Sequence, residues 1–231
     1  MHPMRHIRAF VEHRPLAGPI VWVLCAQYFL VQVVVASAWK QLPYSWRDNS
    51  ISDLAATSCG QFDDRFVCSP LHGLMNISLI LLGLTMAIGS ALMYQEFRKA
   101  RSGFYLMGVA GIGAILVGFF PENTMYPIHL LGADLAFVLS NIALIIFGLR
   151  LRLPRWSRWY SVGSGTVALV ALFLFLSHMD FFLGLGGMER VVAYPQTIWL
   201  IVSGLYMLKS RNRRAMIKGD EREYTNCRPV C

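Results

Sequence analysis

Charged residues are scarce in this chain. Asp, Glu, Lys and Arg make up 15% of its 231 residues, whereas a soluble domain carries roughly 25%. That is too little charge to coat one or two soluble domains of this length. The chain also lacks the G-x-S-x-G, H-E-x-x-H and C-x-x-C patterns and the glycine-rich phosphate loops. A soluble enzyme core, a coiled coil and a disulfide-stapled mini-protein are therefore excluded.

Hydrophobic residues, in contrast, make up 55% of the sequence and fall in long blocks. Five blocks contain no charged residue: 15–39, 73–95, 102–121, 159–177 and 191–208. A sixth block, 123–149, is equally apolar but contains His129 and Asp134. A membrane-spanning helix needs ~20 mostly apolar residues, and spanning strands would need alternating segments of ~10. The sequence predicts an all-α, polytopic six-helix transmembrane bundle in the cell membrane.

The basic residues predict how this bundle is oriented. With six spans, 17 of the 21 Lys and Arg residues fall on the side of the two termini. The positive-inside rule then places both termini in the cytoplasm. The expected organisation is a cytoplasmic segment 1–17, a membrane domain 18–209 with one long outer loop at about 40–70, and a basic cytoplasmic tail 210–231. The net charge of +8 is thus a topology signal, and the expected partner is the lipid bilayer rather than a nucleic acid.

The five cysteines are divided between the predicted compartments. Cys59 and Cys68 both lie in the long outer loop, on the side of the membrane where disulfides persist. We expect a disulfide between them. Cys25 lies within the first span, and Cys227 and Cys231 lie in the reducing cytoplasmic tail.

Acidic and histidine side chains outside the cytoplasmic regions all map to the outer half of the spans or to the outer loops. They are Asp48, Asp53, Asp63, Asp64, Glu122, Asp134, Asp180, Glu189, His72, His129 and His178. Ionisable groups at membrane depth normally face the bundle interior or water. A polar pocket that opens outward explains this distribution. The alternatives are local: histidines that reach lipid headgroups, Glu122 at a helix end, Glu189 paired with Arg190, and Asp134 in a buried hydrogen bond.

Several segments resemble one family, the "domain of unknown function 998" family of prokaryotic six-helix membrane proteins. They are Asn49-Ser50-Ile51-Ser52-Asp53-Leu54, residues 76–83, the run 111–123 that ends in Pro121-Glu122-Asn123, residues 128–133, and Gly187-Met188-Glu189-Arg190 followed by Trp199. The resemblance covers roughly residues 18–210 and implies a fold and a topology, but no activity. By matching position it implies a site made of Asn49, Ser52, Asp53, Glu122, His129, Glu189 and Arg190. Asp134 and His72 are not part of this match. They are added to the site because they are expected at a similar depth in the membrane and on the same, outer side.

Two classes of function fit these residues. In the first, the protein binds or transports a lipid headgroup or a small polar ligand without a cofactor. Asn49, Ser52, Asp53 and Asp134 would line that site, Arg190 would contact an anionic group, and the carboxylates would handle a proton or cation.

The alternative is a membrane-embedded lipid hydrolase. Asp53, His72, His129 and His178 would hold a zinc ion, and Glu122 or Glu189 would be the general base. The histidines lie on separate helices, without an i,i+4 pair.

Overall fold

The computed structural model describes residues 16–40, 42–62, 65–151, 153–177, 179 and 182–226, with side chains as far as residue 209. Within this part of the chain, six helices are long and apolar enough to cross a membrane. The first is α2 (Ala17–Val23), continued through η1 (Leu24–Ala26) into α3 (Gln27–Ser37). The others are α4 (His72–Tyr94), α5 (Arg101–Phe119, preceded by η3, Arg98–Ala100), α6 (Tyr126–Arg150), α7 (Arg155–Leu176) and α8 (Gly184–Asn226). The all-α architecture expected from the sequence is confirmed.

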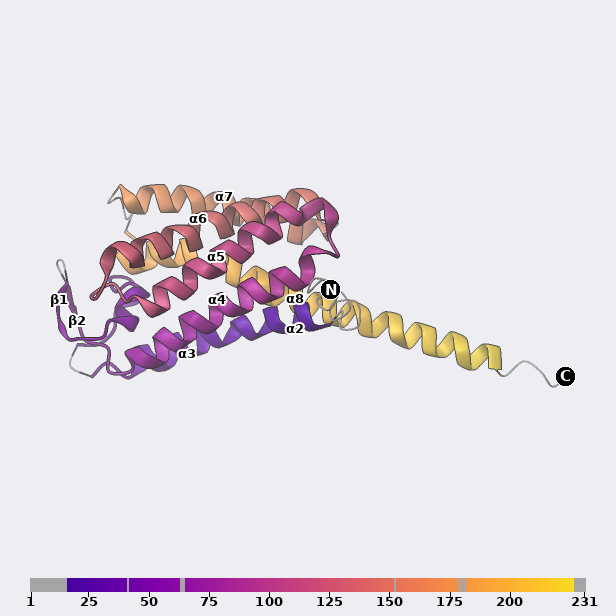
Figure 1. Ribbon diagram of the computed structural model, residues 1–231, viewed down its shortest axis with the longest axis horizontal. Helices are drawn as coiled ribbons and strands as arrows, with labels where there is room; N and C mark the ends of the chain where they lie inside the picture. Colours follow the sequence, from indigo (N-terminus) through magenta and orange to yellow (C-terminus); the bar gives the residue numbers. More distant parts are fainter. Residues whose placement is uncertain are drawn as a thin grey trace, which may run out of the picture.

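The helices form a closed ring (Figure 1). Each helix from α4 to α8 packs against the next one along the chain, and α2 packs against both α4 and α8, which closes the ring. The start of α2 and the point where α8 leaves the bundle lie at the same end of this bundle. The opposite end carries the 38–71 segment, at the left in Figure 1, and is called the loop end below.

Glycines place α5 between α4 and α6. A Cβ at Gly111 would lie 2.5 Å from the carbonyl oxygen of Gly83 on α4, and one at Gly113 would lie 2.5 Å from that of Gly132 on α6. No side chain fits in this space, so the three backbones approach directly. Small residues at such contacts allow close packing in lipid, where no hydrophobic force drives helices together.

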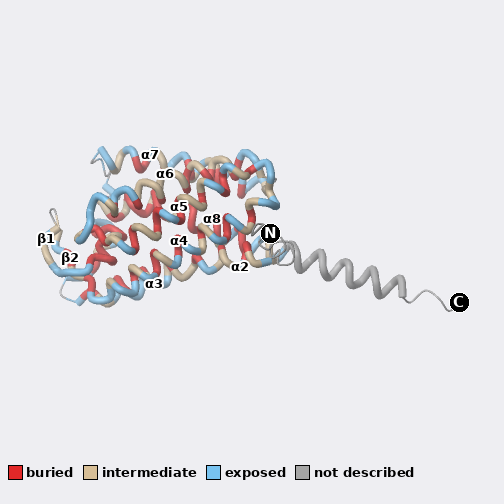
Figure 2. The backbone as a smooth tube through the Cα atoms, viewed as in Figure 1, coloured by how far each residue is buried: buried red, intermediate tan, exposed pale blue. Residues whose placement is uncertain are grey.

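Large apolar side chains cover the outside of the bundle, as a lipid-facing surface requires. Leu30 is 68% exposed and Phe173 is 70% exposed, and exposed segments alternate with buried ones along the helices (Figure 2). In the interior, Trp22, Phe104, Phe147 and Trp199 form successive ring contacts with centroids 4.6–5.9 Å apart. This aromatic cluster joins the first, third, fourth and last spans.

Two spans begin earlier than their charge-free blocks. α7 starts at Arg155 and α8 at Gly184, whereas the blocks start at 159 and 191. Glu189 and Arg190, which precede the last block, lie inside α8 and are buried, whereas Arg158, which precedes the 159–177 block, lies on α7 and is exposed. α8 continues without a break past residue 209, the expected end of the membrane domain, to Asn226.

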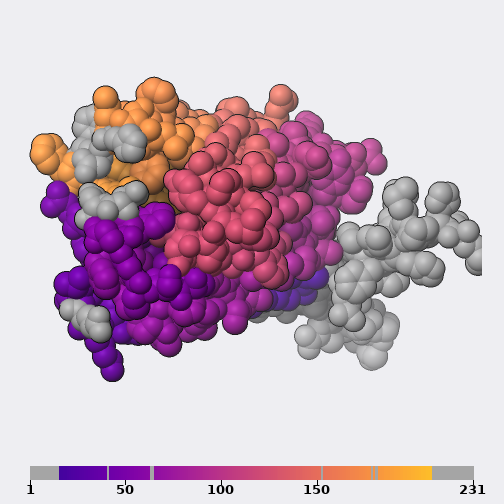
Figure 3. Space-filling view, turned by 60° about the vertical axis from the view of Figure 1, so that its left-hand side comes forward, coloured from indigo at the N-terminus to yellow at the C-terminus, as the bar shows by residue number. Residues whose placement is uncertain are grey.

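The loop end is closed by the segment between α3 and α4. It contains a short helix, η2 (Ser52–Ala55), and a two-stranded antiparallel hairpin of β1 (Gly60–Phe62) and β2 (Arg65–Val67), with Gly60 opposite Val67 and Phe62 opposite Arg65. In the space-filling view this segment lies against α6 and covers the end of the ring (Figure 3). Ile51, Leu54, Ala55 and Ala56 are buried, so η2 is packed onto the ring and is not an exposed loop. The segment between α3 and α4 is called the cap below.

Candidate functional site

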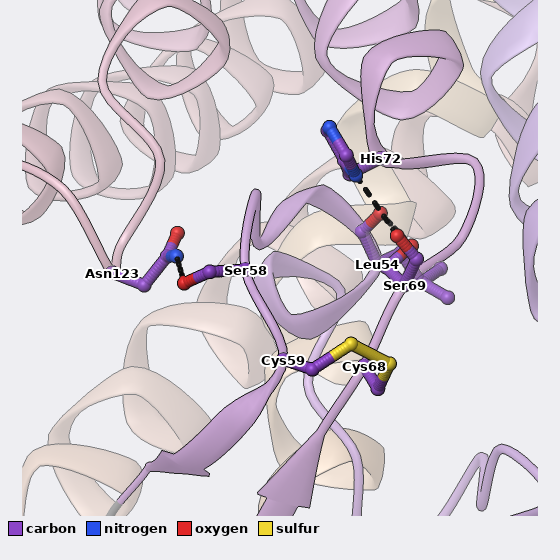
Figure 4. The surroundings of a disulfide bond; sticks show 7 residues. All are labelled: Leu54, Ser58, Cys59, Cys68, Ser69, His72 and Asn123. Atoms are coloured by element: carbon purple, nitrogen blue, oxygen red, sulfur yellow. Dashed lines mark hydrogen bonds between the residues drawn. A yellow bond between two sulfur atoms is a disulfide. The ribbon is translucent and has the colours of Figure 1, made fainter. Parts of the chain in front are cut away.

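A disulfide and two side-chain hydrogen bonds hold this cap in place (Figure 4). Cys59 and Cys68 form the expected disulfide at the base of the hairpin. The Ser69 hydroxyl donates to the Leu54 carbonyl of η2 at 2.7 Å, and Asn123, between α5 and α6, donates to Ser58 at 2.8 Å. The cap is therefore tied both to itself and to the neighbouring helices.

Ser52 lies where η2 meets α6 and α8. Its hydroxyl is 3.1 Å from Nε2 of His129 on α6 and 3.5 Å from Oε1 of Glu189 on α8. The other oxygen of Glu189 accepts the backbone N–H of Ile51 at 2.5 Å. Two residues that are 77 and 137 positions away from Ser52 in the sequence thus meet at this serine. We call Ser52, His129 and Glu189 the serine cluster.

A second group lies on the other side of η2. Asp53 is fully buried and accepts hydrogen bonds from both Nε and Nη2 of Arg65 at 2.9 Å, from the Asn49 side chain and from the backbone N–H of Ser50. Glu122, also buried, places Oε2 3.9 Å from Nη2 of the same arginine and shares a hydrogen bond with Asp53. Two carboxyls thus meet under one guanidinium.

The two carboxyls have opposite protonation preferences. Burial, together with the hydrogen bond and the negative charge of Asp53, raises the pKa of Glu122 to about 10. Burial would also raise the pKa of Asp53, but hydrogen bonds from Arg65, Glu122 and Asn49 and the charge of Arg65 outweigh it and hold that pKa below its ordinary value. Like charges this close cannot both ionise readily. At neutral pH the group therefore holds one proton, on Glu122, and its Asp53 and Arg65 charges cancel.

Arg190 holds the cap to α8. Its Nη1 donates to the carbonyls of Trp46 at 3.0 Å, Asn49 at 3.1 Å and Gly186 at 2.6 Å, and its Nη2 donates to the Tyr44 hydroxyl. The guanidinium also lies 4.8 Å from the centre of the Trp46 ring. These contacts direct the guanidinium to the protein's own loop, so contact with an anionic ligand stays a prediction.

A cavity of about 40 Å³ lies beside the serine cluster, between α3, α4, α5, α6 and α8. Ser52 and Glu189 line one part of it, together with Tyr28 of α3 and Gln196 of α8. The remaining wall is apolar and comes from α4, α5, α6 and α8: Leu79, Leu82, Met86, Ala114, Val117, Ala133, Ala136, Phe137 and Ala193, with Ile51 from the cap.

Tyr28 and Gln196 were not identified from the sequence. Tyr28 is 3% exposed and Gln196 5% exposed, and no hydrogen bond among the described residues involves either side chain. The side-chain amide oxygen of Gln196 is fully buried and has no hydrogen-bond partner among the described residues. Each is one polar side chain within an apolar block, and only the ring arrangement shows that both face the cavity.

The remaining predicted site residues lie apart from this cluster. Nδ1 of His72 donates to the Ser69 carbonyl at 2.9 Å, at the start of its own helix (Figure 4). Asp134 is half-buried and does not line the cavity, and His178 lies outside the described residues. No three His, Cys, Asp or Glu side chains in the described ranges lie close enough to hold a metal ion. Among the described residues, Asp53, His72 and His129 are therefore not grouped as the alternative zinc-hydrolase prediction requires.

One protein-family model matches the chain over all six spans. The family model described as "Protein of unknown function (DUF998)" matches residues 23–206. The chain belongs to this family. The match extends from the first span to the last, which confirms the resemblance read from the sequence fragments. No curated protein and no solved structure matches the chain. The DUF998 assignment therefore supports a multi-pass membrane protein and leaves the role of the serine cluster to be argued from its geometry.

Proposed function

We propose that this DUF998 protein is a membrane-embedded binding protein whose central cavity takes a lipid headgroup or a small polar ligand. The observation that carries the proposal is the side-chain amide oxygen of Gln196, which is fully buried and has no hydrogen-bond partner among the described residues. The Gln196 side chain lines the same cavity as Ser52 and Glu189. A buried acceptor without a partner costs ~1–3 kcal/mol. A ligand that donates a hydrogen bond there would remove this cost.

The size and chemistry of the cavity define the ligand group. A water-sized group needs ~10–15 Å³ of such space, so a cavity of about 40 Å³ holds roughly three. Glu189 and Gln196 offer acceptor oxygens, and the other walls are mainly apolar. The ligand, or the part of it that enters, is therefore a small group with a hydroxyl or ammonium donor and some apolar surface.

Two observations support a cavity that is loaded from outside the cytoplasm. The excess of basic residues favours cytoplasmic termini, and the loop end carries a disulfide, which persists in oxidising compartments. Both support a position of the cap and the serine cluster at the outer face of the cell membrane. There the protonated Glu122 and its partner Asp53 give the cap a group that can exchange a proton with the outside.

Native mass spectrometry of the detergent-purified protein tests this proposal. The wild type should retain a small bound molecule or a specific lipid. Ala133→Leu adds three carbons to the cavity wall and should remove that bound mass. The control, Ala91→Leu, makes the same change on the exposed face of α4 and should keep it. Equal occupancy in all three proteins, or no bound molecule in the wild type, would refute the binding function.

A further inference from the structure

The contact between Ser52 and His129 has a defined direction. Nδ1 of His129 lies 2.9 Å from the backbone carbonyl of Phe120, and a carbonyl oxygen only accepts. Nδ1 must therefore carry the proton, which leaves Nε2 of the neutral ring as an acceptor. The Ser52 hydroxyl, 3.1 Å away, then donates to Nε2. A nucleophile that donates to a base, which is itself oriented by a third group, is the arrangement of activated serines in acyl transfer.

The environment of Ser52 also suits a nucleophile. Its neighbours Ile51, Asp53, Leu54 and Ala55 are all buried, whereas Ser52 is half-buried and lines the cavity. The backbone of the cap is fixed on both sides of it, by Glu189 at Ile51 and by Arg65 at Asp53. The hydroxyl is therefore held rigidly and is still accessible to a group in the cavity.

Tyr28 supplies the remaining requirement, a donor for the developing oxyanion. Its hydroxyl makes no hydrogen bond within the described residues, and its side chain lines the cavity that Ser52 lines. Tyrosine hydroxyls serve as oxyanion donors when they are preorganised in a site that excludes water. A carbonyl group bound in a cavity this small lies within reach of both side chains.

We propose that Ser52, with His129 as general base and Tyr28 as oxyanion donor, hydrolyses esters of short acyl groups. This activity rests on the proposed ligand cavity and names its substrate class. The group that enters is then an acyl group, which only accepts hydrogen bonds, and a water molecule bound beside it would be the donor to Gln196. An acetyl group has three non-hydrogen atoms, which matches the space for roughly three water-sized groups in about 40 Å³. The alcohol part of the ester stays outside the cavity.

The chemical steps balance without a cofactor. The Ser52 oxygen bonds to the acyl carbon while its proton moves to Nε2 of His129. The ester C–O bond then breaks, and His129 returns the proton to the departing alcohol. Water attacks the acyl-serine, gives one proton to His129, and releases the carboxylic acid as Ser52 regains its proton. Throughout, Nδ1–H of His129 stays bonded to the Phe120 carbonyl, which orients the ring.

The test uses the purified full-length protein with two probes, p-nitrophenyl acetate and methanesulfonyl fluoride, whose methanesulfonyl group is close to acetyl in size. The wild type should hydrolyse the acetate at least ten times faster than p-nitrophenyl octanoate. The sulfonyl fluoride should modify Ser52, as located by peptide mass spectrometry. Ser52→Ala, His129→Gln and Tyr28→Phe should each reduce hydrolysis about 100-fold or more; for Tyr28→Phe this is the loss expected for one oxyanion donor. Hydrolysis by the wild type should also fall in acid buffer, where the imidazole binds a proton.

The control serine is Ser37, at the same end of the bundle. Its hydroxyl donates to the Val34 carbonyl of its own helix at 2.8 Å and has no histidine beside it. Ser37→Ala should leave both readouts unchanged, and the Cys59–Cys68 disulfide and thermal unfolding confirm that each variant is folded. Absence of Ser52 modification in the wild type, or wild-type hydrolysis by folded Ser52→Ala, would overturn the esterase proposal. If native mass spectrometry still finds a ligand that Ala133→Leu excludes, the binding function stands without the esterase.

Discussion

Replacement of Arg190 by methionine should detach the cap from the bundle. Methionine is similar in length but cannot donate, so the carbonyls of Trp46 and Asn49 lose their bonds to Nη1. Hydrogen bonds from a charged donor contribute ~1.5–3 kcal/mol each. At the lower limit, the two bonds from Nη1 to these loop carbonyls contribute about 3 kcal/mol. The bond from Nη2 to the Tyr44 hydroxyl and the ring contacts with Tyr44 and Trp46 add to this.

Hydrogen exchange of the cap measures this loss directly. Since 1.4 kcal/mol corresponds to a factor of ten, the backbone amides of residues 44–55 should exchange about 100-fold faster in Arg190→Met than in the wild type. Amides in α5 should keep their rates, because the change is local to the cap. The readout is mass spectrometry of peptides from the detergent-purified protein.

Arg47 provides the matched control. It lies in the same loop, but its side chain is 64% exposed, and its ion pair among the described residues is with the equally exposed Asp48 at 3.7 Å. Surface pairs of this kind contribute little, so Arg47→Met should leave exchange of the cap nearly unchanged. Equal exchange rates in Arg190→Met and Arg47→Met would show that the cap is held by other contacts and would refute the role given to Arg190.

Three further predictions concern the loop end. Folding raises the pKa of Glu122 to about 10, so the protonated side chain stabilises the fold at low pH, and this contribution is lost as the pH rises from about 4.5 towards 10. Thermal unfolding in detergent should show this decline in stability for the wild type and a flatter pH profile for Glu122→Gln. Identical profiles would contradict the pKa assignment. Reduction of the Cys59–Cys68 disulfide should lower the free energy of unfolding by about 2–3 kcal/mol in the loop-entropy model. Thiol labelling of the unreduced, denatured protein should leave these two cysteines unlabelled. Labelling of all five cysteines would disprove the bridge. Reporter fusions at the two ends of the chain should both report the cytoplasm, and opposite locations would contradict the proposed orientation.

The six spans could be predicted because each depends on local composition. A run of ~20 apolar residues has to be a helix in lipid, whatever its neighbours. The starts of α7 and α8 were placed too late because charge was taken as the end of a span. Glu189 and Arg190 lie inside α8 because the cap supplies partners for both, and such partners cannot be read from local sequence.

The candidate site was only partly predictable for the same reason. Helix direction and depth indicated that Asp53, Glu122, His129 and Glu189 belong to one end of the bundle, and each of them contacts η2 or a residue bonded to it. Which side of η2 each residue occupies depends on how the cap folds, and no periodicity encodes that. The serine cluster and the Asp53–Arg65–Glu122 group are consequently separate, although the sequence suggested a single layer.

The central claim is that Ser52, His129 and Glu189 meet at one point, and an engineered metal site tests it most directly. Ser52→Cys would place a thiolate beside an imidazole and a carboxylate, a ligand set that suits tetrahedral Zn²⁺ or its substitute Co²⁺. Titration with Co²⁺ should produce a thiolate-to-cobalt absorption band at one equivalent. The band should be absent from the wild type and lost when His129→Gln is added to Ser52→Cys. A Ser52→Cys protein that shows no band, or a band that persists without His129, would contradict the account.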